Sequence, residues 1–313
     1  MRKKTNVEAV VPQKSVQAQR RERKNMVVGY LFILPIVIHI LVFQLVPILA
    51  SLGLSFTDYD GLKTAKFVGI RNFVEMFTDD KYFWLSLRVT LKFAVVQVPL
   101  KLGFALIVAI LLAKGSKATG IYRLCFYVPS LVGSSVAVAT TWKVLWGNEG
   151  VINSLLEAVG MAPVNWLNNK VVTLYVLILL GVWQFGSIML VFLGGIQSVP
   201  QTYHEAAVID GANSWQRFWK ITFPILTPSL FYNLVTTIIG CMQAFGSAFL
   251  ITQGGPRNTT LYYSLHLYNT AFINWEFGYA CAMSWFMMLI ITALTVLVFR
   301  SSNRWVFYQD ERD

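Results

Sequence analysis

The chain has 313 residues, of which 56% are hydrophobic and only 13% are charged, and its mean hydropathy is +0.56. So apolar a composition excludes a disordered, collagen-like or coiled-coil chain and exceeds what one soluble core can bury, which indicates a membrane protein. The net charge of +11 is compatible with nucleic-acid binding, but basic residues also collect on the cytoplasmic side of membrane proteins.

A polar and basic tail occupies residues 1–25, and we expect it to be cytoplasmic. The apolar run that follows is longer than the ~7–15 apolar residues of a secretory signal, so we expect it to remain as a membrane anchor. In all, six apolar segments are long enough to cross a bilayer core of ~30 Å as helices, which pair their own backbone polar groups. The expected spans are 26–56, 85–113, 121–146, 171–197, 224–251 and 277–299.

The sequence therefore predicts an all-α polytopic membrane protein, with a six-helix transmembrane domain at 26–300 and a cytoplasmic C-terminal tail at 301–313. The basic residues predict its orientation. If the N-terminus is cytoplasmic, the inner segments carry 16 Lys and Arg and the outer loops carry 6. The positive-inside rule then places both termini in the cytoplasm. It also explains most of the excess of basic residues, so nucleic-acid binding is not needed to explain it.

Several absences in the sequence narrow the function. No Asp or Glu falls within an expected span, whereas proton- and sodium-driven carriers commonly use intramembrane carboxylates. No G-x-x-x-x-G-K-[ST] motif occurs, so the chain has no P-loop of its own for ATP. The three cysteines lie in apolar runs, and no spacing of Cys and His suits a metal. We expect no catalytic residues, metal or cofactor in this chain.

The inner loop at 198–223 carries the most informative pattern. Thr202 and Glu205 have the spacing of a capping box, which predicts that a helix begins after Thr202. Gly211 is well placed to end that helix in a left-handed turn. Either Asn213 or Ser214 can then cap a second short helix.

One face of the first loop helix would hold the positions i, i+3, i+4 and i+7. Two alanines make this face low enough for another protein to sit close. An ordinary amphipathic loop at the membrane interface is the alternative on physical grounds. The residues of the face are Tyr203, Ala206, Ala207 and Asp210.

The spacing E-A-A-x3-G-x9-I-x-x-P in this loop resembles the EAA loop of permease subunits in binding-protein-dependent ABC importers. Phe223 stands where the family usually has Leu, which keeps an apolar group. The segment 252–256 (TQGGP) is similar to the T-x-G-G-P signature of the first permease in sugar-importer pairs of the maltose and glycerol-phosphate subfamily, and 30–35, 68–73 and 277–280 are similar to it as well. The matching loop residues are Glu205, Ala206, Ala207, Gly211, Ile221 and Pro224.

The resemblance implies that the helix at 205–211 docks in a cleft of a separate ATPase subunit and carries the closure of the ATPase dimer to the fourth and fifth spans. It gives Glu205 the role of capping its helix and meeting basic partner groups, and Gly211 the role of the turn. Ala206 and Ala207 would allow close approach, with Asp210 on the same face. These are coupling roles and not catalytic ones.

The implied partners are a second, non-identical permease, two ATPase subunits that bind ATP and magnesium, and an extracytoplasmic sugar-binding protein. The implied location is the cytoplasmic membrane of a prokaryote. The implied function is the translocation of a carbohydrate into the cytoplasm. The sequence does not specify which sugar.

The sequence gives weaker evidence for the residues of the substrate path than for the inner loop. Aromatic faces and amide or hydroxyl groups bind carbohydrates, and polar side chains that face lipid are expensive. Hydrogen bonding between helices is the alternative role for the polar candidates. The candidates are Trp183, Gln184, Asn233, Gln243 and Phe245.

Two other classes of function remain open at this point. A secondary carrier working alone would need an internal ion relay, which the acid-free spans do not show. A membrane anchor or sensor would pass a signal through the inner loop without transport. An importer subunit should co-purify with an ATPase, whereas a lone carrier should not.

Overall fold

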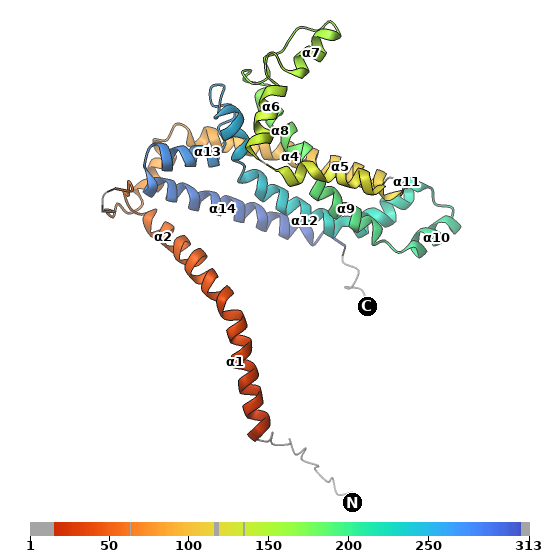
Figure 1. The fold of residues 1–313 in the computed structure, drawn as a ribbon, viewed down its shortest axis with the longest axis horizontal. Coiled ribbons are helices and arrows are strands. Elements are labelled where there is room, and N and C mark those ends of the chain that lie inside the picture. Colours follow the sequence, from red (N-terminus) through yellow and green to blue (C-terminus); the bar gives the residue numbers. More distant parts are fainter. Residues whose placement is uncertain (1–15, 63, 116–118, 134, 308–313) are drawn as a thin grey trace, which may run out of the picture. The chain divides into compact units, whose positions relative to one another are not determined.

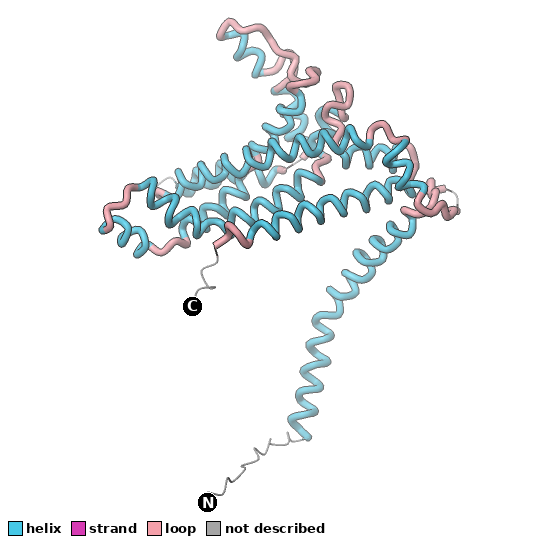
Figure 2. Tube along the Cα trace, turned by 180° about the vertical axis from the view of Figure 1, so that it is seen from behind, coloured by secondary structure: helices cyan, strands magenta, loops and turns pink. Residues whose placement is uncertain are grey.

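The computed structural model describes residues 16–62, 64–115, 119–133 and 135–307. Parts of both expected tails lie outside these residues. The contacts divide the chain into two units, 1–54 and 55–313. Within the described residues the structure consists of helices and loops, and the single isolated bridge pairs Thr57 with Phe67 (Figure 2).

The first unit is one apolar helical segment. It comprises α1 (Val16–His39), a π-helical turn η1 (Ile40–Leu45) and α2 (Val46–Leu54). Its stretch Arg23–Leu54 is long and apolar enough to cross a membrane, as expected for the first span. The helix begins at Val16, so it also takes in the described end of the basic tail.

The second unit is built around α4 (Phe83–Ala113), which packs against α8, α9 and α12 (Figure 1). Small side chains allow the neighbouring helices to approach α4 closely, because Ala105 and Ala109 are fully buried. The other elements are α3 (Arg71–Thr78), α5 (Thr119–Val132), α6 (Val136–Leu145), α7 (Val151–Ala158), α8 (Thr173–Trp183), α9 (Gly186–Gln197), α10 (Gln201–Ile209), α11 (Ser214–Arg217), η2 (Phe218–Thr222), α12 (Phe223–Met242), η3 (Ala248–Thr252), α13 (Tyr263–Tyr268), η4 (Asn269–Ile273) and α14 (Phe277–Ser302).

The structure contains four to six candidate spans, depending on how two bent helix pairs are counted. Beside the first span, three single helices pass the test of length and hydropathy: Phe83–Ala113, Ser214–Met242 and Phe277–Ser302. The expected span at 171–197 is the pair α8 and α9, bent by 45°, and the expected span at 121–146 is the pair α5 and α6, bent by 104°.

The expectation of a continuous helix over 121–146 is therefore wrong. Gly133 has a left-handed φ of +56°, which ends α5. Ser135 then caps α6 by accepting a hydrogen bond from the Val138 N–H at 3.3 Å. The expected fifth span, 224–251, differs too, because its helix begins earlier, at Ser214, and ends at Met242.

Asp80 ties together three helices at the N-terminal end of α4. Its Oδ1 accepts the Tyr82 and Phe83 N–H groups at 2.8 and 3.1 Å and so pairs two backbone donors at the start of α4. Its Oδ2 lies 2.7 Å from His266 Nε2 on α13 and accepts the Tyr279 hydroxyl of α14 at 2.8 Å. Burial by itself raises the pKa of Asp80, but the hydrogen bonds and the His266 charge outweigh it and lower that pKa to about 2.

Replacing Asp80 by asparagine is expected to lower the free energy of unfolding by about 1–3 kcal/mol, because hydrogen bonds to a charged carboxylate are stronger than neutral ones. Since the folded pKa is depressed, this contribution is complete above the ordinary pKa of 3.8 and is lost as the pH falls toward 2. Thermal unfolding of the purified protein in detergent, from neutral to acidic pH, measures it. The control is Asp79→Asn, at an exposed carboxylate bonded to Thr78; equal shifts in the two variants would contradict the assignment.

The first turn of α14 lies against the backbone at 57–59. The Gly278 N–H donates to the Tyr59 carbonyl at 3.0 Å, and Gly278 is buried. A Cβ at this position would lie 3.0 Å from the Thr57 carbonyl carbon and from the Tyr59 nitrogen, and closer still to the Thr57 oxygen. Only glycine therefore allows this contact without a backbone shift.

Candidate functional site

The loop helix α10 begins two residues earlier than the sequence predicts. Pro200, with φ −60° and ψ 132°, occupies the N-cap position, and Gln201 is the first helical residue. Thr202 therefore lies inside the first turn, and no side-chain hydrogen bond caps this end of the helix. The expected capping box of Thr202 and Glu205 is wrong, because the extended proline already directs the chain into the helix.

The end of α10 confirms the predicted role of Gly211. Its φ is +78°, in the left-handed region that favours glycine. The Gly211 N–H donates to the Val208 carbonyl at 3.0 Å, and the Ala212 N–H donates to the Ala207 carbonyl at 2.9 Å. These two bonds make a Schellman motif, which satisfies the last carbonyls of the helix.

Asn213 begins the next helix with a complete capping box. Its Oδ1 accepts the Gln216 N–H at 2.8 Å, and the Gln216 side chain accepts the Asn213 N–H at 2.9 Å. The expected short second helix does not stop, however. The helical segments α11, η2 and α12 run on as one apolar helix from Ser214 to Met242.

The predicted face of α10 is present as a single face. Its four residues line one cavity of about 450 Å³, whose other wall is formed by η2, the start of α12 and Phe307. Two apolar residues of α10 are strongly exposed: the exposed fraction is 87% for Ile209 and 54% for Val208. The cavity is lined by Tyr203, Ala206, Ala207, Asp210, Lys220, Ile221, Pro224, Ile225 and Phe307.

A second, polar cavity of about 320 Å³ lies near the middle of α4, and we call it the central cavity. It is formed where the middle of α4, the bend between α8 and α9, and α12 come together. Of the predicted path residues, Gln184 lies in its wall, and the Gln184 Nε2 donates to the Gly133 carbonyl at 3.0 Å. The lining residues are Gln97, Lys101, Gly181, Gln184, Ile188, Thr236, Thr237, Gly240 and Cys241.

The other four predicted path residues do not line this cavity. Trp183 is 40% exposed and its ring lies 5.9 Å from that of Trp142. Asn233 is 2% exposed, and its Nδ2 is buried without a hydrogen-bond partner among the described residues. Gln243 is exposed where α12 ends, and Phe245 stacks on Phe249 with their centroids 4.9 Å apart.

Sequence reasoning missed Gln97, Lys101, Thr236 and Thr237 as cavity residues. Lys101 carried the strongest available signal, because a charged residue within an apolar span is costly and usually has a function. Gln97, one helical turn earlier at i−4, lies on the same face of α4 as Lys101. The i, i+4 spacing would therefore have indicated that Gln97 and Lys101 lie together.

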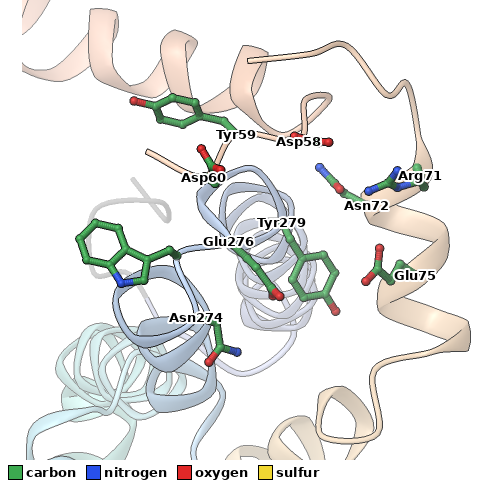
Figure 3. A pocket seen from close by; sticks show the side chains of 10 residues that line it. Asp58, Tyr59, Asp60, Arg71, Asn72, Glu75, Asn274, Glu276 and Tyr279 are labelled. Carbon is green, nitrogen blue, oxygen red and sulfur yellow. The ribbon is translucent and has the colours of Figure 1, made fainter. Parts of the chain in front are cut away.

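A third cavity, of about 210 Å³, is acidic (Figure 3). Asn72 fixes its wall by donating to the Ser55 and Thr57 carbonyls at 2.8 and 2.9 Å. Burial, followed by the charges of Glu75 and Asp80, raises the pKa of Glu276. No three His, Cys, Asp or Glu residues in the described part of the chain are placed to hold a metal ion. The lining residues are Asp58, Tyr59, Asp60, Arg71, Asn72, Glu75, Asn274, Trp275, Glu276 and Tyr279.

Comparison with known proteins gives a consistent result. The family described as "binding-protein-dependent transport system inner membrane component" matches residues 101–308. The chain is 47% identical to the probable ABC transporter permease protein YesP of Bacillus subtilis, over 96% of this chain and 98% of that protein. It is 36% identical to the lactose transport system permease protein LacF of Rhizobium radiobacter, over 88% and 94%.

The fold has a close counterpart among solved structures. A chain of a bacterial alginate ABC transporter, solved in complex with an alginate pentasaccharide-bound periplasmic protein, superposes with a TM-score of 0.79. The match covers 91% of this chain and 96% of that chain at 21% sequence identity.

Proposed function

This chain belongs to the binding-protein-dependent transport system inner membrane components and is a sugar ABC permease of that family, and we propose that it moves a carbohydrate into the cytoplasm using ATP hydrolysed by partner subunits. An extracytoplasmic binding protein would deliver the sugar. ATP and magnesium would bind to the partner ATPases and not to this chain, which has no P-loop sequence.

The observation that carries the coupling proposal is the geometry of α10. It is a nine-residue helix held between an extended proline and a Schellman turn, and it presents apolar side chains at Val208 and Ile209 to the outside. A short rigid helix with an exposed apolar surface suits docking against another protein. We assign coupling roles to Glu205, Ala206, Ala207, Asp210 and Gly211.

The orientation follows from the proposal. The loop holding α10 would be cytoplasmic, together with both termini, and the acidic cavity of Figure 3 would face the binding protein. The bent pairs α5–α6 and α8–α9 would each count as one span, which gives six. A second, non-identical permease would complete the membrane domain.

The orientation can be tested with single cysteines. We expect a cysteine at Val159, an exposed residue that follows α7, to react with an impermeant maleimide from outside intact cells. We expect a cysteine at Lys114, which follows α4, to react only in opened membranes. The native Cys125, Cys241 and Cys281 are first replaced by alanine. The reverse labelling pattern would contradict the proposed topology.

The function is tested by reconstitution. The tagged chain is co-expressed with its neighbouring permease and ATPase, purified, and placed in proteoliposomes with ATP inside and the sugar-loaded binding protein outside. We expect the ATPase to co-purify, and sugar uptake to require both ATP and the binding protein. Uptake by this chain alone, driven by an ion gradient, would indicate a secondary carrier. Co-purification without uptake of any sugar would favour a sensor.

A further inference from the structure

Lys101 places a positive charge in the wall of the central polar cavity. It lies near the middle of α4, a helix of 31 residues that is apolar enough to span the membrane. Within the described part of the chain, Lys101 makes no hydrogen bond or ion pair. No Asp or Glu lines the cavity either. An intramembrane charge without a counter-charge is costly, so it indicates a charge supplied from elsewhere.

Lys92, on the same helix, differs from Lys101 because its charge has a partner within the chain. Its Nζ lies 5.4 Å from the centroid of the Tyr175 ring, which is a cation–π contact. Lys92 is also exposed on the helix surface and lines no cavity with Lys101. The two lysines therefore have different surroundings, although both belong to α4.

Gln97 adds an unused hydrogen-bonding group to the same wall. Gln97 is only 6% exposed, and its Oε1 is buried with no hydrogen-bond partner among the described residues. Gly181 makes room for this amide, because a Cβ at that position would lie 2.5 Å from the Gln97 Oε1. A buried amide oxygen without a partner is costly, and it suits a donor such as a sugar hydroxyl.

The remaining polar groups of the cavity are neutral. Gln184 contributes an amide from the α8–α9 bend, and Thr236 and Thr237 contribute hydroxyl groups from α12. One cation among amides and hydroxyls matches a ligand that carries one anionic group and several hydroxyl groups. A single lysine balances the one charge of a carboxylate better than the higher charge of a phosphate.

We propose that this cavity is a binding site for an acidic sugar, a uronate whose carboxylate pairs with Lys101 while its hydroxyl groups bond to Gln97, Gln184 and Thr236. This rests on the proposed function, since it names the class of carbohydrate that the chain carries. A neutral sugar would leave the Lys101 charge uncompensated inside the membrane, so the site selects against it.

The first test measures transport by the complete complex in proteoliposomes. The substrates are digalacturonate and its dimethyl ester, which has the same ring skeleton without the charges, and glucose 6-phosphate serves as the phosphate probe. Lys101→Gln is expected to lower digalacturonate uptake by about tenfold or more, without lowering uptake of the ester. Lys101→Arg should retain much of the uptake. Lys92→Gln is the matched control and should keep the wild-type preference.

The outcomes separate the site from the function. Wild-type uptake of the ester in preference to digalacturonate would overturn the acidic-sugar proposal and leave sugar import standing. An equal loss for both sugars in Lys101→Gln would also overturn it, provided that equal amounts of ATPase co-purify. Preferential uptake of glucose 6-phosphate would replace the carboxylate by a phosphate and would equally overturn the uronate assignment.

The second test needs neither a sugar nor the binding protein. A cysteine at Thr236, in a background whose native cysteines are alanine, is reacted in the purified complex with anionic sulfonatoethyl and cationic trimethylammonium-ethyl methanethiosulfonates. Lys101→Gln is expected to lower the anionic-to-cationic rate ratio several-fold, and Lys92→Gln to leave it unchanged. A ratio that does not respond to Lys101 would overturn the proposal even if no uptake of any sugar were found.

Discussion

Valine at position 211 is expected to abolish most ATP-driven uptake and most co-purification of the ATPase, while the chain still inserts in the membrane. The backbone there has a φ of +78°, which a β-branched residue adopts at a cost of about 1–2 kcal/mol or more. The Schellman bonds to Val208 and Ala207 would open, and α10 would lose its fixed end. The measurements are the ATPase recovered per permease and the initial rate of uptake.

The chain contains its own control for this experiment. Gly160 has a φ of +79° and ends α7 with the same two bonds: its N–H donates to Glu157, and the Met161 N–H donates to Leu156, each at 2.9 Å. Gly160→Val therefore introduces similar backbone strain outside the loop at 198–223. We expect it to leave the ATPase bound and uptake largely intact. Equal losses in the two variants would show that strain alone, and not coupling, explains the effect.

Gly278→Ala is expected to prevent most of the protein from folding. The added methyl group would press on the backbone at Thr57 and Tyr59, which cannot give way as a flexible side chain can. It would also separate the Gly278 N–H from the Tyr59 carbonyl. We expect a loss of at least about 2–4 kcal/mol, measured as a lower yield of monodisperse protein and a lower unfolding temperature in detergent.

Gly103→Ala provides the comparison, because a Cβ at that position in α4 meets nothing within 4 Å. Alanine is the better helix former by about 1 kcal/mol, so this variant should be as stable as the wild type or slightly more so. If Gly278→Ala behaved like Gly103→Ala, the close contact between α14 and the segment 57–59 would not exist.

The sequence predicted the helix ends in the loop at 198–223 better than it predicted the breaks within the long apolar segments. Gly211 and Asn213 act through their own backbone and nearest neighbours, so their roles could be predicted from type and spacing. The prediction of a Thr202–Glu205 capping box was wrong because the helix begins two residues earlier, with Pro200 at the N-cap. The break between α5 and α6 could not be predicted for another reason: a single glycine in an apolar stretch looks the same whether or not its φ is positive.

The central cavity could not be predicted from the sequence because its walls come from three distant segments. Gln184 was a candidate from its own surroundings, but only the fold brings Gln97 and Thr237 to it. Trp183, the last residue of α8, lies instead beside Trp142, whereas Gln184 is the first residue of the bend. Hydropathy identifies the spans but does not say which faces meet.

The helix Ser214–Met242 extends from the loop that holds α10 to the central cavity, so under the proposed function it would act as a lever between them. Its 29 residues have a length of about 43 Å at a rise of 1.5 Å per residue. Asn213 caps one end, while Thr236, Gly240 and Cys241 reach the cavity near the other. A tilt of about 5° about the cavity end would therefore displace the loop end by about 4 Å, from the same helical length. The displacement of the loop and the tilt at the cavity would thus belong to a single movement. The length of the helix sets the ratio between them.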